Sequence, residues 1–387
     1  MRRKPVIISA QSTEIILKYI WQQKDWPHFR WDAHVVSGVL AEAVFKEGRF
    51  LGELAGIGFR NRNQAGFEAL TSEIVSSAAI EGEALNLADV RSSVARRMEI
   101  VLSDKRAVSH ELDARVDMMM DATRNWAEPM SLRRLKAWHA ALFPTGYSGL
   151  VRVRAGKLRD DREGPMQVVS RRGTMMRVHF EAPPAESLSG AVKDLVGWLG
   201  GDDPTTPSLV RVALAHLWFL TLHPFEDGNG RLARALTDYL LARQERSDLR
   251  FYSLSAQIQK EKSGYYDELE HAQRNTLDVT RWVAWFLSLH SRAIDSAAVV
   301  LKGILAKARF WQMHAQCDFN PHQREMLNRI LDGFEGHVTS SKWAKICKVS
   351  QDTATREISQ LVAAGVLRQE GGGRSTHYDI DLKGSEK

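Results

Sequence analysis

Apolar side chains recur at three- and four-residue intervals along most of the chain, which is typical of amphipathic helices. One such series precedes Pro224 and consists of Leu209, Val212, Ala213, Leu217 and Leu220. Because proline disfavours the α conformation at the residue before it, this helix should end at His223. A second series follows a Gly228–Asn229–Gly230 turn and comprises Leu232, Leu236 and Leu240. The pattern therefore predicts a mainly α protein with a loop between these two helices.

Two further segments upstream have readable patterns. Apolar positions mark a helix at Phe67, Leu70, Ile74 and Ala78. It should end near Glu81, because Gly82 is of the residue type that most often adopts the left-handed conformation after a helix. Residues 166–170 and 177–180, separated by Arg171–Arg172–Gly173, predict the two strands of a hairpin.

The C-terminal part, about 320–387, has the rhythm of a winged helix-turn-helix. The inner faces of two short helices are predicted at Trp343, Ile346, Cys347, Ala354, Ile358, Leu361 and Val362, and a hairpin is predicted around Gly371–Gly373. Thr353 and Arg356 would point outward from the second helix, where a recognition helix meets DNA, and Arg374 would lie on the wing. Asp352 and Glu357 should dilute the positive charge of that outer face. Such modules also contact proteins, so DNA and protein partners both stay open.

The loop from His223 to Arg234 reads HPFEDGNGRLAR and gathers the groups that phosphate chemistry requires. Arg231 and Arg234 crowd the positive end of the second helix, and a bound polyanion would offset that repulsion. Asp227 can hold Mg²⁺, which typically takes one or two protein carboxylates and completes its shell with phosphates and water. His223 can accept a proton from a hydroxyl at neutral pH, since the ordinary pKa of histidine is about 6.5.

This segment resembles the signature of Fic-domain proteins, HPFx(D/E)GNGRxxR, at every fixed position. The resemblance implies a helical Fic core that transfers AMP from ATP to a hydroxyl side chain of a target protein. It implies His223 as the base and Asp227 as the magnesium ligand. Nucleotide binding would fall to Gly228, Asn229, Gly230, Arg231 and Arg234.

A second resemblance lies far upstream. Ser77-Ala78-Ala79-Ile80-Glu81-Gly82 is similar to the inhibitory motif of Fic proteins, (S/T)xxxE(G/N). By that resemblance Glu81 pairs with Arg234 and denies it to the γ-phosphate of ATP. Alternatively, this enzyme would remove AMP, with Glu81 positioning the water, and the sequence does not separate the two roles.

The remaining resemblances concern substrate contacts. The predicted hairpin resembles the flap that Fic enzymes use to hold a target peptide as an added strand, through Val168, Val169 and Ser170. Tyr265 and Gln273 lie where relatives place residues that contact the nucleotide. An aromatic residue at helical spacing also suits a core position, so both interpretations of Tyr265 stay open.

Five regions follow from these patterns. They are a Trp-rich N-terminal helical domain (1–60), which resembles an uncharacterised domain preceding bacterial Fic cores, an inhibitory helix region (61–110), a Fic catalytic core (111–295), a connecting helix (296–319) and a winged helix-turn-helix (320–387). Clustered tryptophans usually indicate packing.

Composition changes this picture little. A length of 387 residues predicts two or three structural units. Apolar runs fall short of a membrane span, so a cytoplasmic protein is expected. Cys317 and Cys347 stand alone, which argues against a disulfide framework. The net charge of +6 is compatible with nucleic acid.

Two classes of function remain. The first is a protein adenylyltransferase, autoinhibited by Glu81, that uses ATP and Mg²⁺ and modifies a protein target or itself. The second is a DNA-binding transcription regulator whose Fic core senses nucleotide or removes AMP. The presence of both His223 and Asp227 favours the enzyme, because a sensor needs neither a base nor a metal ligand. The target and the oligomeric state, a homodimer included, stay open.

Overall fold

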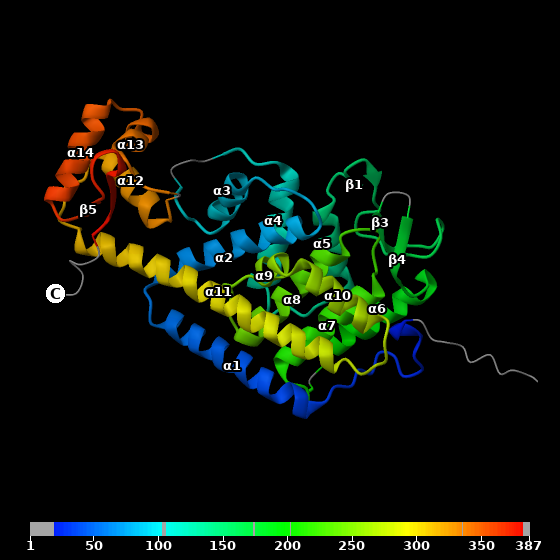
Figure 1. Cartoon of the computed structure of the whole chain (residues 1–387). Helices are drawn as coiled ribbons and strands as arrows, with labels where there is room; N and C mark the ends of the chain where they lie inside the picture. The colour runs from blue at the N-terminus through cyan, green and yellow to red at the C-terminus, as the bar shows by residue number, and fades with distance from the viewer. Residues whose placement is uncertain (1–18, 103–105, 173–174, 202, 335, 382–387) are drawn as a thin grey trace, which may run out of the picture. The chain divides into compact units, whose positions relative to one another are not determined.

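The computed structural model describes residues 19–102, 106–172, 175–201, 203–334 and 336–381. These residues form two compact units, unit 1 up to Ala297 and unit 2 from Ala298 onward. Both are mainly helical, as the hydrophobic pattern predicts (Figure 1). Among the described helices, none is long and apolar enough to cross a membrane.

Unit 1 contains most of the helices and two small hairpins. Its elements are η1 (Ile20–Gln22), α1 (Ala33–Ala55), α2 (Phe59–Ile80), α3 (Leu87–Arg97), α4 (His110–Arg124), α5 (Leu132–Leu142), β1 (Tyr147–Ser148), β2 (Val151–Arg152), β3 (Gln167–Arg172), β4 (Met175–Glu181), α6 (Ala185–Gly200), α7 (Ser208–Leu222), α8 (Asn229–Glu245), α9 (Leu254–Lys260), α10 (Lys262–Gln273) and the first half of α11 (Thr280–Met313).

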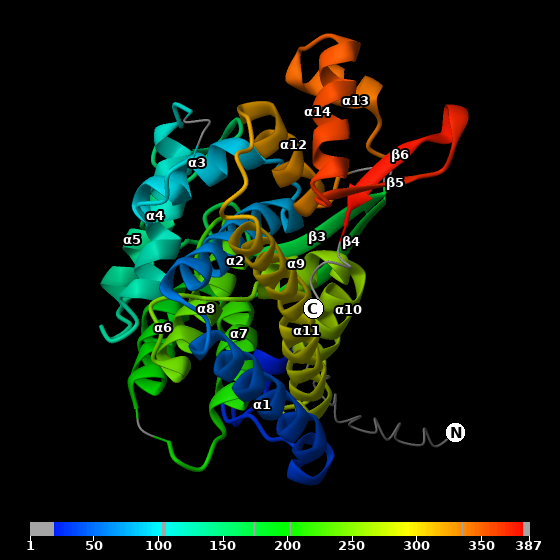
Figure 2. The same ribbon diagram turned by 90° about the vertical axis from the view of Figure 1, so that its left-hand side faces the viewer.

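Helices α7 and α8 form the centre of unit 1. All residues of 212–222 and of 231–242 are buried, which is the pattern of helices surrounded by other helices. Figure 2 shows α6 and α10 on opposite sides of this pair, and α4 packs against α8. The two central helices are joined by the His223–Gly228 loop, so the candidate chemistry lies between two buried helices.

Helix α2 ends where the sequence predicts. Glu81 is its C-cap residue, and Gly82 follows with φ +82°. The backbone N–H of Gly82 donates to Ala79 O and that of Glu83 donates to Ala78 O, both at 3.0 Å. This pair of bonds is a Schellman motif, which fixes the direction in which Glu81 and Glu83 leave the helix.

The tryptophan-rich N-terminal stretch packs against the core. Trp26 and Phe29 make edge-to-face contacts with Trp218 of α7, with ring centroids 6.3 and 6.1 Å apart. The indole N–H of Trp21 donates to the carbonyl of Glu181 at 2.7 Å. These tryptophans therefore serve packing, which is the interpretation that clustered tryptophans favour.

The predicted hairpin is present as β3 and β4. Val169 pairs with Val178, next to a bulge between Val168 and Val169. Within the described residues this sheet has two strands, so β3 keeps a free edge. Arg274, the C-cap residue of α10, donates to the carbonyls of Val178 and His179 at 2.7 Å.

Unit 2 begins within α11, so the predicted connecting helix (296–319) is the continuation of a helix that starts at Thr280. The other elements of unit 2 are α12 (Pro321–Leu331), α13 (Ser340–Cys347), α14 (Gln351–Ala363), β5 (Leu367–Glu370), η2 (Gly373–Ser375) and β6 (His377–Ile380). The helices α13 and α14 and the hairpin β5–β6 lie at the predicted segments, whereas α12 was not predicted. Trp343, Ile358 and Leu361 lie in the core of the unit.

One prediction about α14 is wrong. Glu357 does not dilute the charge of the outer face, because it is 5% exposed. Its carboxylate accepts from the Trp343 indole N–H at 2.8 Å and from Asn320 Nδ2 at 3.1 Å. Helical spacing alone predicted an outward position for Glu357. The side chain is buried instead because its carboxylate pairs with polar groups of α13 and of the start of α12 that would otherwise lack partners.

Candidate active site

His223 ends α7 in an uncommon backbone conformation. As the C-cap residue it has φ +48°, which non-glycine residues adopt only where their surroundings hold them. Its Nδ1 lies 3.3 Å from the Leu220 carbonyl, so Nδ1–H donates and Nε2 keeps its lone pair. Burial lowers the pKa of His223 to about 4. The ring is therefore neutral at pH 7, and Nε2 can accept a proton.

The glycine turn after His223 is tightly enclosed. Gly228 has φ +75°, and a Cβ atom there would lie 2.9 Å from the Phe143 ring. The Asn229 side chain binds the backbone of Phe225 on both sides, accepting from its N–H at 3.0 Å and donating to its carbonyl at 2.8 Å. Asn229 thus shapes the loop through its side chain. What it offers an anion is its backbone N–H in the first turn of α8.

The Arg234 guanidinium binds residues at the end of α2. The side chain is 3% exposed, its Nε donates to Ser77 Oγ at 2.9 Å and its Nη2 donates to Glu81 Oε1 at 2.8 Å. The predicted contact between Glu81 and Arg234 is therefore present. A Cβ atom at Gly230 would collide with the same Glu81 oxygen. The Glu81 carboxylate consequently lies against the first turn of α8, where an anion would bind.

Arg231 is occupied by a carboxylate that the sequence did not single out. Glu83 Oε2 lies 3.2 Å from Arg231 Nη1, and Glu83 Oε1 lies 2.5 Å from Arg115 Nη1. Arg231 also stacks over Phe143, 5.0 Å from the ring centroid. The segment after α2 therefore contacts both arginines of the motif. In the sequence, Glu83 could have been found as a second acidic residue two positions after Glu81.

Asp227 is the most open carboxylate of the loop. Its side chain is 44% exposed, and Oδ1 lies 3.7 Å from Arg231 Nη2. The Gly228 N–H donates to the same oxygen at 2.5 Å. One accessible carboxylate beside an anion-binding helix start fits Mg²⁺, which uses few protein ligands when phosphates supply the rest.

Two buried side chains that the sequence analysis missed hold the loop. Arg159 is 3% exposed, and its Nε donates to the His223 carbonyl at 2.8 Å. Its backbone N–H donates to the Pro224 carbonyl at 3.0 Å. Arg159 therefore fixes the backbone that presents His223. No local pattern marks it, because its partners lie elsewhere in the chain.

His139 of α5 supports the other end of the loop. Its ring stacks on Phe225 with centroids 4.2 Å apart, and Nδ1 accepts from the Gly156 N–H at 2.9 Å. Nε2–H therefore donates to the Asp227 carbonyl at 3.2 Å. Burial lowers the pKa of His139 to about 4, which keeps the neutral form that these two bonds need.

Tyr265 and Gln273 are 2% and 4% exposed. The Tyr265 hydroxyl lies 2.9 Å from His216 Nε2, and Gln273 Nε2 lies 3.4 Å from Thr221 Oγ1. Both side chains thus contact α7. Their contact with adenosine stays a prediction.

The flap residues lie on β3. Val169 is 41% exposed, and Ser170 Oγ lies 2.7 Å from His179 Nε2 of β4. An exposed edge with apolar and hydroxyl side chains can accept an added strand, which is compatible with the predicted role. Target binding by Val168, Val169 and Ser170 remains a prediction.

In unit 2, Arg356 is exposed on α14, and Thr353 Oγ1 lies 2.9 Å from Ser350 Oγ at the start of that helix. The Arg374 side chain lies outside the described residues.

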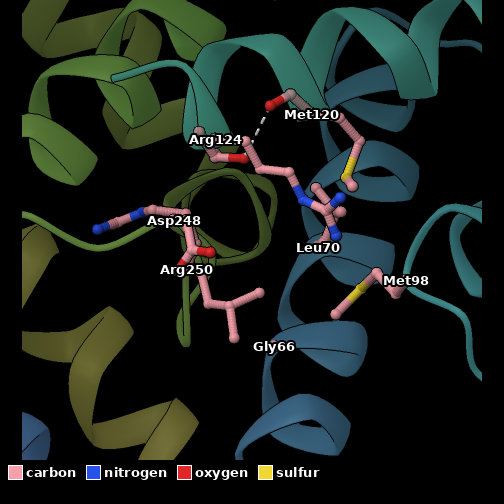
Figure 3. Close-up of a pocket in the computed structure, with 9 residues that line it drawn as sticks. Gly66, Leu70, Met98, Met120, Arg124, Asp248 and Arg250 are labelled. Carbon is pink, nitrogen blue, oxygen red and sulfur yellow. Dashed lines mark hydrogen bonds between the residues drawn. The ribbon is translucent and has the colours of Figure 1, made fainter. Parts of the chain in front are cut away.

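A separate pocket in unit 1, drawn in Figure 3, is lined by Gly66, Leu70, Met98, Met120, Thr123, Arg124, Asp248, Leu249 and Arg250. It shares no residue with the predicted site.

The fold and the loop together define a class: helical proteins that present a histidine, a carboxylate and two arginines around a helix start. Residues 129–241 match the Fic/DOC family model, and residues 19–100 match a domain of unknown function, DUF4172. The chain therefore contains a Fic/DOC domain.

Relatives agree with this assignment. A protein adenylyltransferase Fic of Culex quinquefasciatus is 26% identical over 236 residues, covering 59% of this chain and 41% of the relative. A protein of the same name from Nematostella vectensis is 29% identical over 134 residues, covering 34% and 30%. The chain thus spans less than half the length of either relative.

Solved structures agree on the fold. A Fic family protein from Desulfovibrio desulfuricans matches with a TM-score of 0.52 at 21% identity, covering 89% of this chain and 95% of that one. A Fic domain containing signaling protein from Bacteroides thetaiotaomicron matches with a TM-score of 0.50 at 18% identity, covering 70% and 97%.

Proposed function

We propose that this protein is an adenylyltransferase that transfers AMP from ATP to a hydroxyl side chain of a target protein or of itself. The observation that carries the proposal is that the buried His223 ring and the exposed Asp227 carboxylate lie on the loop leading into α8, a helix whose start has no side-chain cap. A base, a metal ligand and an anion site within one loop are what such a transfer requires.

In the proposed reaction the target hydroxyl oxygen attacks the α-phosphorus of ATP. The oxygen–phosphorus bond forms as the bond to pyrophosphate breaks, and His223 Nε2 takes the hydroxyl proton. The backbone N–H groups at the start of α8 and the Arg231 guanidinium bind the charged oxygens. Mg²⁺ held by Asp227 would offset the charge of the phosphates when bound.

We infer that the segment after α2 inhibits this reaction. Glu81 pairs with Arg234 at 2.8 Å and Glu83 with Arg231 at 3.2 Å, so both guanidiniums already bind a carboxylate that would compete with the triphosphate. Both carboxylates would also repel it. Inhibition by Glu81 matches the family motif, whereas Glu83 extends it to the second arginine.

The free edge of β3 is the proposed binding place for the target. A strand added there would receive main-chain hydrogen bonds from β3, which recognises an extended segment with little dependence on its side chains. Val168, Val169 and Ser170 would then contact residues next to the modified hydroxyl.

The position of the transferred label tests the reaction class. With Mg²⁺ and ATP labelled at either the α- or the γ-phosphate, the Glu81→Gly variant should incorporate the α-label only. Incorporation of the γ-label would mean phosphoryl transfer instead. If Glu81→Gly incorporates neither label into itself or into an extract, while the unchanged protein but not Glu81→Gly releases AMP from AMP-modified protein, Glu81 serves AMP removal and the second function class is favoured.

A further inference from the structure

The hairpin β5–β6 of unit 2 has one face on the core and one face outward. The cross-strand pairs are Leu367–Ile380, Arg368–Asp379, Gln369–Tyr378 and Glu370–His377. Leu367 and Ile380 lie in the core, and side chains alternate between the two faces along a strand. Glu370, His377 and Asp379 therefore share the outward face.

A third segment adds to this face. Val338 forms an antiparallel bridge with Tyr378, which places His337 opposite Asp379 and on the same side. The rings of His337 and His377 are 4.0 Å apart between centroids. The His337 ring therefore lies beside the His377 ring, on the face that carries Glu370 and Asp379.

The ligand atoms already lie close together. One atom each from Glu370, His377 and Asp379 falls within 4.8 Å of the others. A tetrahedral site with metal–ligand bonds near 2.1 Å needs separations of about 3.4 Å, which side-chain rotation on a half-exposed surface can supply.

His377 is oriented as metal-binding histidines are. Its Nδ1–H donates to the Ser375 carbonyl at 3.0 Å, which leaves Nε2 as the ligand atom. That Nε2 lies 3.4 Å from Glu370 Oε2, and the His377 side chain is 17% exposed. A backbone carbonyl on the second ring nitrogen is the usual means of fixing the tautomer of a ligand histidine.

We propose that Glu370, His377 and Asp379 bind a divalent transition-metal ion, Zn²⁺ above all, and that the exposed His337 side chain rotates to become the fourth ligand. Two imidazoles and two carboxylates suit this ion in four-coordinate geometry. Arg368 pairs with Glu370 Oε1 at 2.8 Å and balances one carboxylate, so the cluster keeps one net negative charge for a cation. The bound ion would tie the segment before α13 to the hairpin and stiffen unit 2.

Metal titration of the whole protein tests this site. After removal of metals with a chelator, Co²⁺ should give the strong visible absorption of a tetrahedral complex, and Zn²⁺ should displace it. His377→Ala should lose that absorption and bind Zn²⁺ at this site about 100-fold more weakly, since even an outer partner costs roughly 10–100-fold. His110→Ala, an exposed histidine of unit 1, is the matched control and should behave as the unchanged protein.

Asp379→Asn is a second variant, and it preserves the shape of the side chain. Asp379→Asn should also lose the Co²⁺ absorption. Circular dichroism verifies that each variant is folded. Equal Co²⁺ spectra and equal Zn²⁺ affinity in the unchanged protein, His377→Ala and Asp379→Asn would overturn the proposal, as would the absence of a tetrahedral spectrum in the unchanged protein.

Discussion

Glu81 and Glu83 leave α2 two residues apart and reach the two arginines of the loop after α7. Glu81 Oε1 lies 2.8 Å from Arg234 Nη2, whereas Glu83 lies 3.2 Å from Arg231 Nη1 and also binds Arg115. Charge-assisted hydrogen bonds are strongest when they are short. The two carboxylates should therefore contribute unequally to inhibition, with Glu81 the stronger.

The first prediction concerns Glu83. Glu83→Gln should raise AMP transfer by roughly two- to five-fold, the equivalent of up to about 1 kcal/mol for an exposed pair. Initial rates with ATP and Mg²⁺ measure this. Glu68→Gln is the matched control, because Glu68 pairs with Arg91 at 2.6 Å and touches no motif residue. A rise of equal size in both variants would mean that α2 has merely loosened.

The second prediction concerns the pH dependence of the base. Burial lowers the folded-state pKa of His223 to about 4, so its neutral form predominates above that pH and is lost only as pH falls through it. In Glu81→Gly the pKa should be no higher, since the Glu81 charge raises it. The kcat/KM of that variant should therefore not fall as the pH is lowered from 8 to about 5.5. A fall in kcat/KM centred near pH 6.5 would contradict the burial of His223.

Local residue chemistry explains which parts of the site the sequence reveals. Pro224 and Gly228 mark the loop because their backbone preferences act on adjacent residues. Arg159 and His139 carry no such mark, since they act through carbonyls of His223 and Asp227 that folding brings to them.

At the scale of elements, α2 controls the site through its end. The Schellman motif directs Glu81 and Glu83, and it depends on Gly82 at φ +82°. Helix ends were predictable because Gly82 and the proline after His223 are local signals. The packing of α2 against α9 was not predictable, because it joins segments that are distant in the sequence. In this contact Glu73 accepts from Ser253 and Ser255 near the start of α9.

The third prediction follows from that glycine. Gly82→Ala places a Cβ in open space but in the left-handed conformation, which costs about 1–2 kcal/mol. Denaturant unfolding should show lower stability, and AMP transfer should rise because the inhibitory end becomes less well held. Gly38→Ala, in open space within α1, should keep or raise stability and leave transfer unchanged. Lower stability of Gly82→Ala without faster transfer would separate the motif from inhibition.

At the scale of the whole molecule, unit 2 is a separate compact module with its own core. Its helices α13 and α14 were predictable because each inner face is a short, strongly periodic apolar series, whereas α12 was not predicted. Its partner was not, because neither the fold nor the charge of one helix face specifies DNA over protein.

The fourth prediction is that unit 2 binds DNA through α14. Binding should weaken as salt rises, and Arg356→Ala should reduce preference among sequences by roughly 1–3 kcal/mol if it contacts a guanine edge. Fluorescence anisotropy with DNA fragments at several salt concentrations measures both. Binding without sequence preference, equal in Arg356→Ala, would assign the module to protein contacts.

The central claim is that His223 transfers AMP once Glu81 no longer holds Arg234. Intact-protein mass spectrometry after incubation with ATP and Mg²⁺, with a cell extract as the source of targets, tests it most directly. Glu81→Gly should add AMP roughly 5–150-fold faster than the unchanged protein, the usual range for a regulatory coupling. Glu81→Gly with His223→Ala should lose about 10²–10⁴-fold of that rate. An equal rate of AMP addition with and without His223, or none in Glu81→Gly, would contradict the account.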